Sequence, residues 1–526
     1  MNNLFRTSRQ MLVLALIICC GCSPKEQNYA NELPISTPEA EGVSSAGVLR
    51  FVDALDQGEN EIHSFVIVRH GKIISEGWWN PYGKELRHVM FSVSKSFTSV
   101  GVGLAIAENK LALTDKVASF FPESLPDTLS TDMQEMNVED LLKMSTGMDN
   151  DPLFQAMGGA ADWPNVFLST PVQQEPGTVF KYNNMATFML SAIVQKATGE
   201  KLFDFLKPRL FEPLGITQAT WDDGPAGVTM GAIGLRIPSN DMAKFGQLLL
   251  QKGKWNGKQL IPESWIEAAT SKHIDSNDPG NTNPTESNDW AQGYGYQFWR
   301  SRHNSYRADG LGGQFILVLP EKDAVVVLTA SSRITQDELN VVWENLLPAM
   351  EEEPLTEDEA SAAALKERIA SLALSKTTST PADSTLLSRV SGKKISLTQN
   401  DLGITALRVV MQEAAATVEF ERDSMQYEIT AGLDSWKMSE TPLTTLNAAP
   451  RADQTQPVKL AATSTWVDAN TFQLSARFVE QAIGSEVWVF RFNPTPAGAD
   501  VQIEVKPIPA DMPFGRPVVV LQGKVE

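Results

Sequence analysis

Segments with strand character stand at both ends of a long helical stretch, and this order constrains the fold more than any other feature. SFVIVRH (64–70) and KIISEGWW (72–79) alternate and are rich in β-branched and aromatic residues, with Gly71 between them, which is typical of a β-hairpin. Strand character returns in QFILVLP (314–320) and AVVVLTA (324–330). This order predicts an antiparallel sheet closed by segments that are distant in the sequence, with a helical subdomain inserted between them.

The stretch between these strands has helical spacing. In residues 94–110 small and apolar side chains recur at the three- and four-residue intervals of one helix face. The clearest further helices are expected at 138–147, 185–199, 238–253 and 338–350. The sequence therefore predicts an α+β fold over residues 35–350.

The character of the sequence changes after residue 350. Residues 351–385 read as a charged helical connector followed by a Ser/Thr/Pro-rich linker. From 386 to 526 short strand-like segments are separated by turn residues, which indicates an all-β domain, either a barrel or a sandwich. A chain of 526 residues also exceeds what one hydrophobic core usually organises. We expect separate domains at 35–350 and 386–526.

The N-terminus has the layout of a secretory signal peptide. Its first ten residues carry two arginines and no acid, and the apolar run that follows is too short to cross a bilayer. Gly21-Cys22 resembles the processing site of bacterial lipoproteins, in which the cysteine receives the lipid. The resemblance implies a signal peptide at 1–21, lipid attachment at Cys22 and a polar tether at 22–34. An ordinary signal peptide cleaved nearby is the alternative.

Ser23 follows the cysteine and resembles the residue found in lipoproteins sent to the outer membrane. We therefore expect the chain to be secreted across the inner membrane. It would then be anchored by its lipid, at the outer membrane, facing the periplasm or the surface. Contact with the membrane is expected through this lipid alone, and the oligomeric state is left open.

Composition and spacing exclude several classes of site. The chain has 44 Lys and Arg against 64 Asp and Glu, a net charge of −20, which repels nucleic acid. Its three cysteines all lie within the first 22 residues, so a disulfide scaffold and a cysteine-based site in the body are excluded. The five histidines never pair at metal-ligand spacing, and no G-x-S-x-G or P-loop pattern occurs. We expect no metal, no cofactor and no nucleic-acid partner.

A serine and a lysine lie one helical turn apart at the start of the 94–110 helix. In SVSK (92–95), Ser92 and Lys95 share one helix face. Serine is a weak nucleophile at neutral pH and needs a base within hydrogen-bond reach, and lysine can be that base when burial lowers its pKa. At a helix N-terminus the backbone N–H of Ser92 is also available to a developing oxyanion. SGKK (391–394) matches the same pattern but lies in the β-rich part without a helix, and we interpret it as a chance match.

A second motif, YNN (182–184), lies in the turn immediately before the predicted helix at 185–199. A tyrosine there can share a proton with Lys95 and pass it to a leaving group. Tyr182 is therefore a candidate acid, and Asn184 a candidate donor to a substrate carbonyl.

A third motif, YRADGLGGQ (306–314), leads through Gly310 into a strand beside the opening hairpin. Glycine lets the backbone come close to a substrate. The N–H of Leu311 could then be the second oxyanion donor.

In this order and spacing, the three motifs resemble those of the penicillin-recognising serine hydrolases. The class C β-lactamase branch, with its esterases and 6-aminohexanoate-dimer hydrolases, is the most similar, and the likeness covers residues 35–350. The resemblance implies Ser92 as the acylated nucleophile, and Lys95 and Tyr182 as coupled base and acid. It further implies the amides of Ser92 and Leu311 as the oxyanion hole, and no metal.

One departure from this family concerns the substrate. β-Lactamases and penicillin-binding proteins usually carry Lys or His two residues before the third-motif glycine, where it attracts the substrate carboxylate. Ala308 stands at that position, alternation points the neighbouring Arg307 to the opposite face, and Asp309 would repel an anion. GLGGQ (310–314) instead resembles the 6-aminohexanoate-dimer hydrolase group. We expect an esterase or amidase for a small-molecule substrate poor in carboxylates, with β-lactamase activity weak or absent.

Two alternatives stay open beside this serine hydrolase. A β-lactamase or D-Ala-D-Ala peptidase acting on cell-wall peptides is favoured by secretion and opposed by Ala308. A non-enzymatic surface-binding protein on the same scaffold is opposed by the intact catalytic side chains. The β-rich part carries no chemical motif, and its Trp436, Trp466 and Trp488 are expected in the core.

Overall fold

The computed structural model describes residues 32–277, 285–375, 377, 379–422, 425–442, 457–481, 485–496, 498–508 and 517–526. The predicted signal peptide, the lipid site at Cys22 and most of the tether lie outside these residues. Within the described part of the chain, no helix combines the length and apolar character needed to span a membrane.

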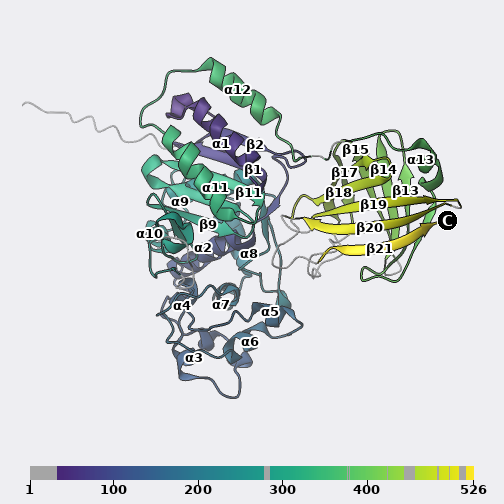
Figure 1. The fold of residues 1–526 in the computed structure, drawn as a ribbon. Coiled ribbons are helices and arrows are strands. Elements are labelled where there is room, and N and C mark those ends of the chain that lie inside the picture. Colours follow the sequence, from purple (N-terminus) through teal and green to yellow (C-terminus); the bar gives the residue numbers. More distant parts are fainter. Residues whose placement is uncertain are drawn as a thin grey trace, which may run out of the picture.

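The N-terminal part is built on an antiparallel sheet with strand order β2-β1-β11-β10-β9-β8 (Figure 1). Its strands are β1 (Glu61–Arg69), β2 (Lys72–Trp78), β8 (Trp299–Ser301), β9 (Ser305–Gly310), β10 (Gln314–Leu319) and β11 (Ala324–Ser331). The first hairpin, β1–β2, pairs through β1 with β11, so strands more than 250 residues apart are neighbours, with Phe65 opposite Leu328. The predicted sheet closed by distant segments is confirmed.

Alternate side chains of the sheet enter two different cores, as the period of a strand requires. Val66 and Ile316 belong to a core shared with α2 (Ser94–Ala107), α7 (Asn184–Thr198) and α9 (Ser239–Leu250). Their neighbours in sequence, including Phe65 and Phe315, belong to a second core shared with α1 (Ser45–Gln57), α11 (Thr335–Val341) and α12 (Glu359–Ala370). Helices therefore cover both faces of the sheet.

Helix α2 runs through the middle of the first core and is buried on all sides, from Ser94 to Ala105. A Cβ on Gly101 would lie 2.4 Å from Leu202 Cδ1, and one on Gly103 would lie 2.4 Å from the ring of Trp265. These glycines allow the close packing of neighbouring helices on both sides of α2. The stripe expected from the sequence is thus only part of a fully buried surface.

The inserted helical subdomain lies below the sheet in Figure 1. Its helices are α3 (Thr131–Glu135), α4 (Val138–Leu142), α5 (Leu153–Met157), α6 (Trp163–Ser169), α7 and α8 (Leu202–Leu206). Helix α4 is shorter than the predicted 138–147, because Met144 turns into the left-handed region at φ 58° and its carbonyl accepts from Lys181 N at 2.8 Å. After α4, backbone hydrogen bonds bring residues 144–147 beside 173–181, next to the candidate motif at 182–184.

The C-terminal part is a β-barrel. Its strands are β12 (Lys394–Leu397), β13 (Ile404–Met411), β14 (Ala415–Arg422), β15 (Met425–Leu433), β16 (Lys437–Thr441), β17 (Val458–Asp468), β18 (Thr471–Phe478), β19 (Ser485–Thr495), β20 (Gly498–Ile508) and β21 (Val519–Val525). Parallel pairing of β15 with β17 closes the ring, and β16 lies outside it on β17. Of the two predicted architectures, barrel or sandwich, the barrel is confirmed. Trp466 and Trp488 lie in its core, as expected, whereas Trp436 packs at the edge of the second core of the N-terminal part.

The connector between the two parts is packed against the N-terminal part. Helix α12 lies against α1, where Arg368 Nε donates to Asp53 at 2.7 Å, and Leu365 enters the second core. The backbone of Leu372 and Leu374 then pairs with that of Asn80. In Figure 1 the chain runs from α12 to the barrel, which lies beside the sheet.

Candidate active site

The candidate nucleophile lies in a tight turn between strand β3 (His88–Val89) and helix α2. The turn is a single 3-10 turn, Phe91–Val93, and Phe91 adopts a left-handed conformation at φ 43°. This conformation is strained for a bulky side chain, and such strain is typical of functional sites. Ser92 remains partly exposed while Ser94 and Lys95, two and three residues later, are buried.

The side chain of Lys95 makes three hydrogen bonds inside the protein. Its Nζ donates to Ser92 Oγ at 2.9 Å, to Asn184 Oδ1 at 2.7 Å and to the carbonyl of Ala232 at 3.0 Å. The residue is 1% exposed. When Lys95 is neutral, its two N–H groups can stay on Asn184 and Ala232, so the lone pair points to the Ser92 hydroxyl. The geometry therefore suits proton transfer from Oγ to Nζ.

The pKa of Lys95 is lowered from its ordinary value to about 7. Burial is the main cause, because the charged ammonium loses its hydration, and the negative charges of Asp151 and Asp309 oppose the shift. A lysine with this pKa is partly neutral at pH 7. With this pKa and this contact to Ser92, Lys95 stays the candidate base that the S-x-x-K spacing predicts.

Tyr182 lies directly above this lysine, with Lys95 Nζ 5.0 Å from the centroid of its ring. Burial raises the pKa of the Tyr182 hydroxyl, and a hydrogen bond with Ser92 acts in the opposite direction. The ring stacks on Trp299 with centroids 5.9 Å apart. Tyr182, which is distant in the sequence, therefore meets Ser92 and Lys95 at one place. Trp299 forms a wall of the site that no motif indicated.

Asn184 is fixed by a residue that the sequence did not reveal. Asp151 Oδ2 accepts from the backbone N–H of Asn184 at 2.8 Å and from its Nδ2 at 2.7 Å, and Oδ1 accepts from Met185 N at 3.1 Å. Asp151 thereby caps the first turn of α7 and turns the Asn184 oxygen toward Lys95. One N–H of the Asn184 amide is engaged, so at most the other can meet a substrate carbonyl. No spacing pattern marks Asp151, which lies 33 residues before Asn184 in the chain.

Gly310, at the end of β9, packs against the turn that carries the nucleophile. A Cβ at this position would lie 2.4 Å from the carbonyl oxygen of Met90. The glycine therefore permits close approach to the backbone before Ser92, and by this contact it brings Leu311 to the site. Leu311 follows in a turn and is 37% exposed.

The loop that carries Leu311 rests on a buried carboxyl group. Gly313, in the left-handed region at φ 86°, could carry no Cβ, because that atom would lie 2.2 Å from Glu338 Oε2. Ser332 Oγ donates to the other oxygen of Glu338. Burial raises the pKa of Glu338 to about 8, so the group is largely protonated at pH 7. The sequence contained no motif for this residue.

Residues 307–309 on β9 lie as strand alternation predicts. Ala308 is buried in the first core, on the face opposite to Arg307 and Asp309. Arg307 is fully buried and its Nε donates to Asp309 Oδ2 at 2.8 Å. Asp309 is near enough to Lys95 and Tyr182 to act on the charge of both. Asp309 is thus paired with Arg307 on the face of β9 opposite to Ala308, and burial raises its pKa while the charge of Arg307 acts in the opposite direction.

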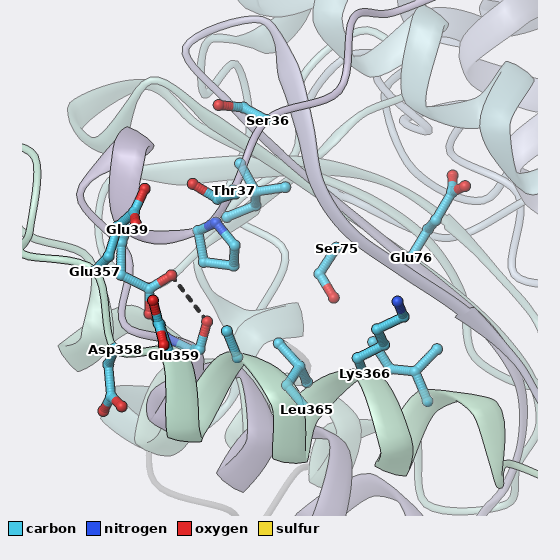
Figure 2. A pocket seen from close by; sticks show the side chains of 15 residues that line it. Ser36, Thr37, Glu39, Ser75, Glu76, Glu357, Asp358, Glu359, Leu365 and Lys366 are labelled. Carbon is cyan, nitrogen blue, oxygen red and sulfur yellow. Dashed lines mark hydrogen bonds between the residues drawn. The ribbon is translucent and has the colours of Figure 1, made fainter.

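A separate hollow of about 420 Å³ lies between α12, β2 and the segment at 36–39 (Figure 2). Glu357, Asp358 and Glu359 stand at one end of it, and Ser75 and Leu365 line its middle. None of its lining residues is one of the candidate catalytic residues. Within the described residues, no group of three or more His, Cys, Asp or Glu side chains is arranged to hold a metal ion.

Comparison with known proteins agrees with this geometry. The Beta-lactamase family model matches residues 52–349. The 6-aminohexanoate-dimer hydrolase of Paenarthrobacter ureafaciens is 23% identical over 287 residues, which cover 51% of this chain and 72% of that protein. A putative D-alanyl-D-alanine carboxypeptidase of Escherichia coli K12 is 26% identical over 136 residues, 24% of this chain and 31% of that protein.

Among solved structures, the putative 6-aminohexanoate-dimer hydrolase from Bacillus anthracis aligns with a TM-score of 0.49 and 23% identity, over 61% of this chain and 87% of that chain. The family model alone spans more than half of the present sequence. The chain belongs to the beta-lactamase family of serine hydrolases.

Proposed function

We propose that the protein hydrolyses an ester or amide through an acyl-enzyme on Ser92. The observation that carries this proposal is the contact of Ser92 Oγ with Lys95 Nζ at 2.9 Å, inside a site that lowers the pKa of Lys95 to about 7. A buried amine with such a pKa is partly neutral at pH 7, so its lone pair is available to accept the serine proton.

In the acylation step, neutral Lys95 accepts the Oγ proton while Oγ attacks the substrate carbonyl carbon. Negative charge develops on the carbonyl oxygen, where the backbone N–H groups of Ser92 and Leu311 stabilise it. Tyr182 then gives its proton to the leaving oxygen or nitrogen as the bond to carbon breaks, and Lys95 returns its proton to Tyr182. The products are an ester on Ser92 and a free alcohol or amine.

Deacylation reverses these roles. Water attacks the acyl carbon, its proton passes through Tyr182 to Lys95, and the bond to Ser92 Oγ breaks as the serine regains a proton. The acid product leaves with one oxygen from water. The steps need no metal and no cofactor.

The proposed substrate is a small ester or amide without a carboxylate beside the scissile bond. The negative charge of Asp309 acts on Lys95, and Ala308 offers no charge that would attract an anion. The named activity of the Paenarthrobacter relative, a 6-aminohexanoate-dimer hydrolase, supports an amide substrate.

A D-Ala-D-Ala peptidase is the second candidate, supported by the name of the E. coli relative. A β-lactamase remains possible on the same chemistry, and Asp309 opposes both. The hydrogen bonds that hold Lys95 against Ser92 favour an enzyme over a non-enzymatic binding protein. For location, we propose secretion and a lipid on Cys22, which mass spectrometry of the membrane fraction would test.

The decisive experiment is the intact mass of the protein after treatment with a fluorophosphonate. One adduct is expected on the wild type, none on Ser92→Ala, and an unchanged adduct on Ser391→Ala. Ser391 belongs to the second S-x-x-K match, and its Oγ accepts from Met411 N at 3.0 Å in the barrel. Equal labelling of wild type and Ser92→Ala would refute the proposal. Competition of the label by ampicillin would instead favour the penicillin-binding alternative.

A further inference from the structure

Two bidentate salt bridges join the barrel to the N-terminal part. Arg477, near the end of β18, donates from Nη1 and Nη2 to the two oxygens of Glu61, each at 2.9 Å. Glu480, just after the same strand, accepts from Nε and Nη2 of Arg87, also at 2.9 Å. The side chains of Arg477 and Glu480 are each 10% exposed. Two-pronged pairs of this kind fix orientation as well as distance.

Apolar contact accompanies the charges. Ala461 and Val479 of the barrel are fully buried and belong to the same core as Trp79 and Tyr82 of the N-terminal part. Lys459 Nζ lies 3.4 Å from Glu480 Oε1 and adds a second positive charge to that carboxylate. The barrel is thus packed into the N-terminal part at this point, beyond its covalent link through the connector.

Both salt bridges lead to β3, the strand before the turn that carries the candidate nucleophile. Arg87 directly precedes β3, the strand His88–Val89, and Ser92 follows only three residues after it. The bridge from Arg87 to the barrel therefore holds the chain five positions before Ser92.

The second bridge reaches the same strand through two buried histidines. The carbonyl of Val89 can only accept, so His88 Nδ1 donates to it at 3.0 Å and His88 Nε2 is left to accept from His63 Nδ1 at 2.8 Å. The other nitrogen of His63, Nε2, lies 3.2 Å from Glu61, the partner of Arg477. With the proton of neutral His63 on Nδ1, this contact becomes a hydrogen bond only when His63 takes up a second proton. Tyr82 stacks on His63 with ring centroids 3.8 Å apart and closes the network.

We propose that the barrel acts on the reaction in cis, with Arg477 and Glu480 as positioning residues that hold β3 and so set the place of Ser92. The inference rests on the proposed role of Ser92 as nucleophile. Its physical basis is the strained turn at Phe91, because a residue with a bulky side chain keeps a positive φ only where the surrounding structure fixes both ends. Helix α2 fixes one end of this turn, and β3, clamped by the barrel, fixes the other.

Point substitutions test this better than removal of the barrel, which would expose the core around Trp79. We choose Glu480→Gln and Arg477→Gln, with Glu504→Gln as the matched control. Glu504 forms a comparable ion pair with Arg491 at 3.2 Å, on the barrel wall. The readouts are kcat and KM for a p-nitrophenyl ester, and hydrogen exchange of the peptide at 86–95.

Glu480→Gln and Arg477→Gln should lower kcat about tenfold with KM nearly unchanged, the size expected when a coupled contact outside the site is lost. Exchange at 86–95 should become faster in both, and neither readout should move in Glu504→Gln. The kcat of the double variant Arg87→Gln/Glu480→Gln should be no lower than that of the slower single variant, because the two substitutions break the same salt bridge.

Wild-type kcat and wild-type exchange in Glu480→Gln would overturn the inference, as would an equal loss in Glu504→Gln. If the wild type takes no label on Ser92, the proposed function fails. Hydrogen exchange would still decide whether the barrel holds β3, so the two failures are distinguishable.

Discussion

Arg307 and Asp309 form an ion pair at 2.8 Å on one face of β9, and the negative charge of Asp309 also acts on the candidate base Lys95. The arginine is fully buried, so its positive charge interacts with Asp309 and with the polar groups around the strand, and not with solvent. Asp309 thus sets the local charge near Lys95, in a family whose penicillin-recognising members usually carry a cation in this motif.

Asp309→Asn should therefore change the charge preference of the enzyme. The substitution removes a negative charge that acts on Lys95 and takes from Arg307 its anionic partner, while the hydrogen bonds of Arg307 to Ser301 and to two backbone carbonyls stay. The ratio of kcat/KM for an anionic ester such as p-nitrophenyl hemisuccinate over neutral p-nitrophenyl acetate should rise about tenfold, which corresponds to about 1.4 kcal/mol. Asp337→Asn, an exposed acid on α11, should leave the ratio unchanged. An unaltered ratio in Asp309→Asn would remove this residue from the account of specificity.

From the lowered pKa of Lys95 we predict the pH profile of the reaction. We also predict that this lysine favours activity at the expense of stability. The acylation rate should rise with pH through about 7, as the amine loses its proton. Its folded-state pKa lies below its unfolded value of 10.5, so the lysine favours folding above pH 10.5 and destabilises the fold progressively as pH falls to about 7. Lys95→Met should therefore lose at least about a thousandfold in kcat. Its Tm at pH 7 should equal or exceed that of the wild type, and a large fall in Tm would contradict this reading of the buried amine.

Local motifs predicted the positions of the candidate groups because the geometry of these motifs is local. One helical turn brings Ser92 and Lys95 together once α2 forms, and a residue just before α7 must lie at its N-terminus. The strand pattern likewise predicted β1, β2, β10 and β11 of the sheet, whereas β8 and β9 were not delimited. Alternation also placed Arg307 and Ala308 on opposite faces of β9.

The missing parts depend on tertiary contacts that have no sequence period. Asp151 reaches Asn184 because residues after α4 follow an extended path, where Met144 leaves the helix. Glu338 meets Gly313 only when α11 packs under the sheet. The choice between barrel and sandwich is decided by the pairing of Gly432 with Thr463, which alternation along single strands does not encode.

Asp151 should be needed for catalysis, although it touches no substrate in the proposed mechanism. Asp151→Ala frees the Asn184 amide to rotate away from Lys95 and removes the acceptor of two backbone N–H groups in the first turn of α7, whose N-cap residue Asn183 stays in place. We expect kcat to fall about tenfold or more, and a loss of about 1 kcal/mol in stability, typical of an N-cap. Asp149→Ala, an exposed acid two residues earlier, is the matched control. Equal effects of the two substitutions would show that the loop as a whole matters, and not the contact with Asn184.

The two buried histidines at the barrel interface should make the fold sensitive to acid. Burial lowers the pKa of His88 to about 3, and the pKa of His63 is lowered as well. The histidines of the unfolded chain take up protons near pH 6.5, whereas those of the folded chain do not. The two histidines therefore leave the free energy of unfolding undiminished above pH 6.5. As pH drops toward 3, His88 lowers the stability by up to about 1.4 kcal/mol per pH unit, and the lowered pKa of His63 adds a loss in the same direction. The Tm of the wild type should therefore fall steeply between pH 6.5 and 4.5, and His88→Gln should flatten this dependence. His303→Gln, a substitution of an exposed histidine, should keep the wild-type slope, and the same slope in His88→Gln would assign the acid sensitivity to other groups.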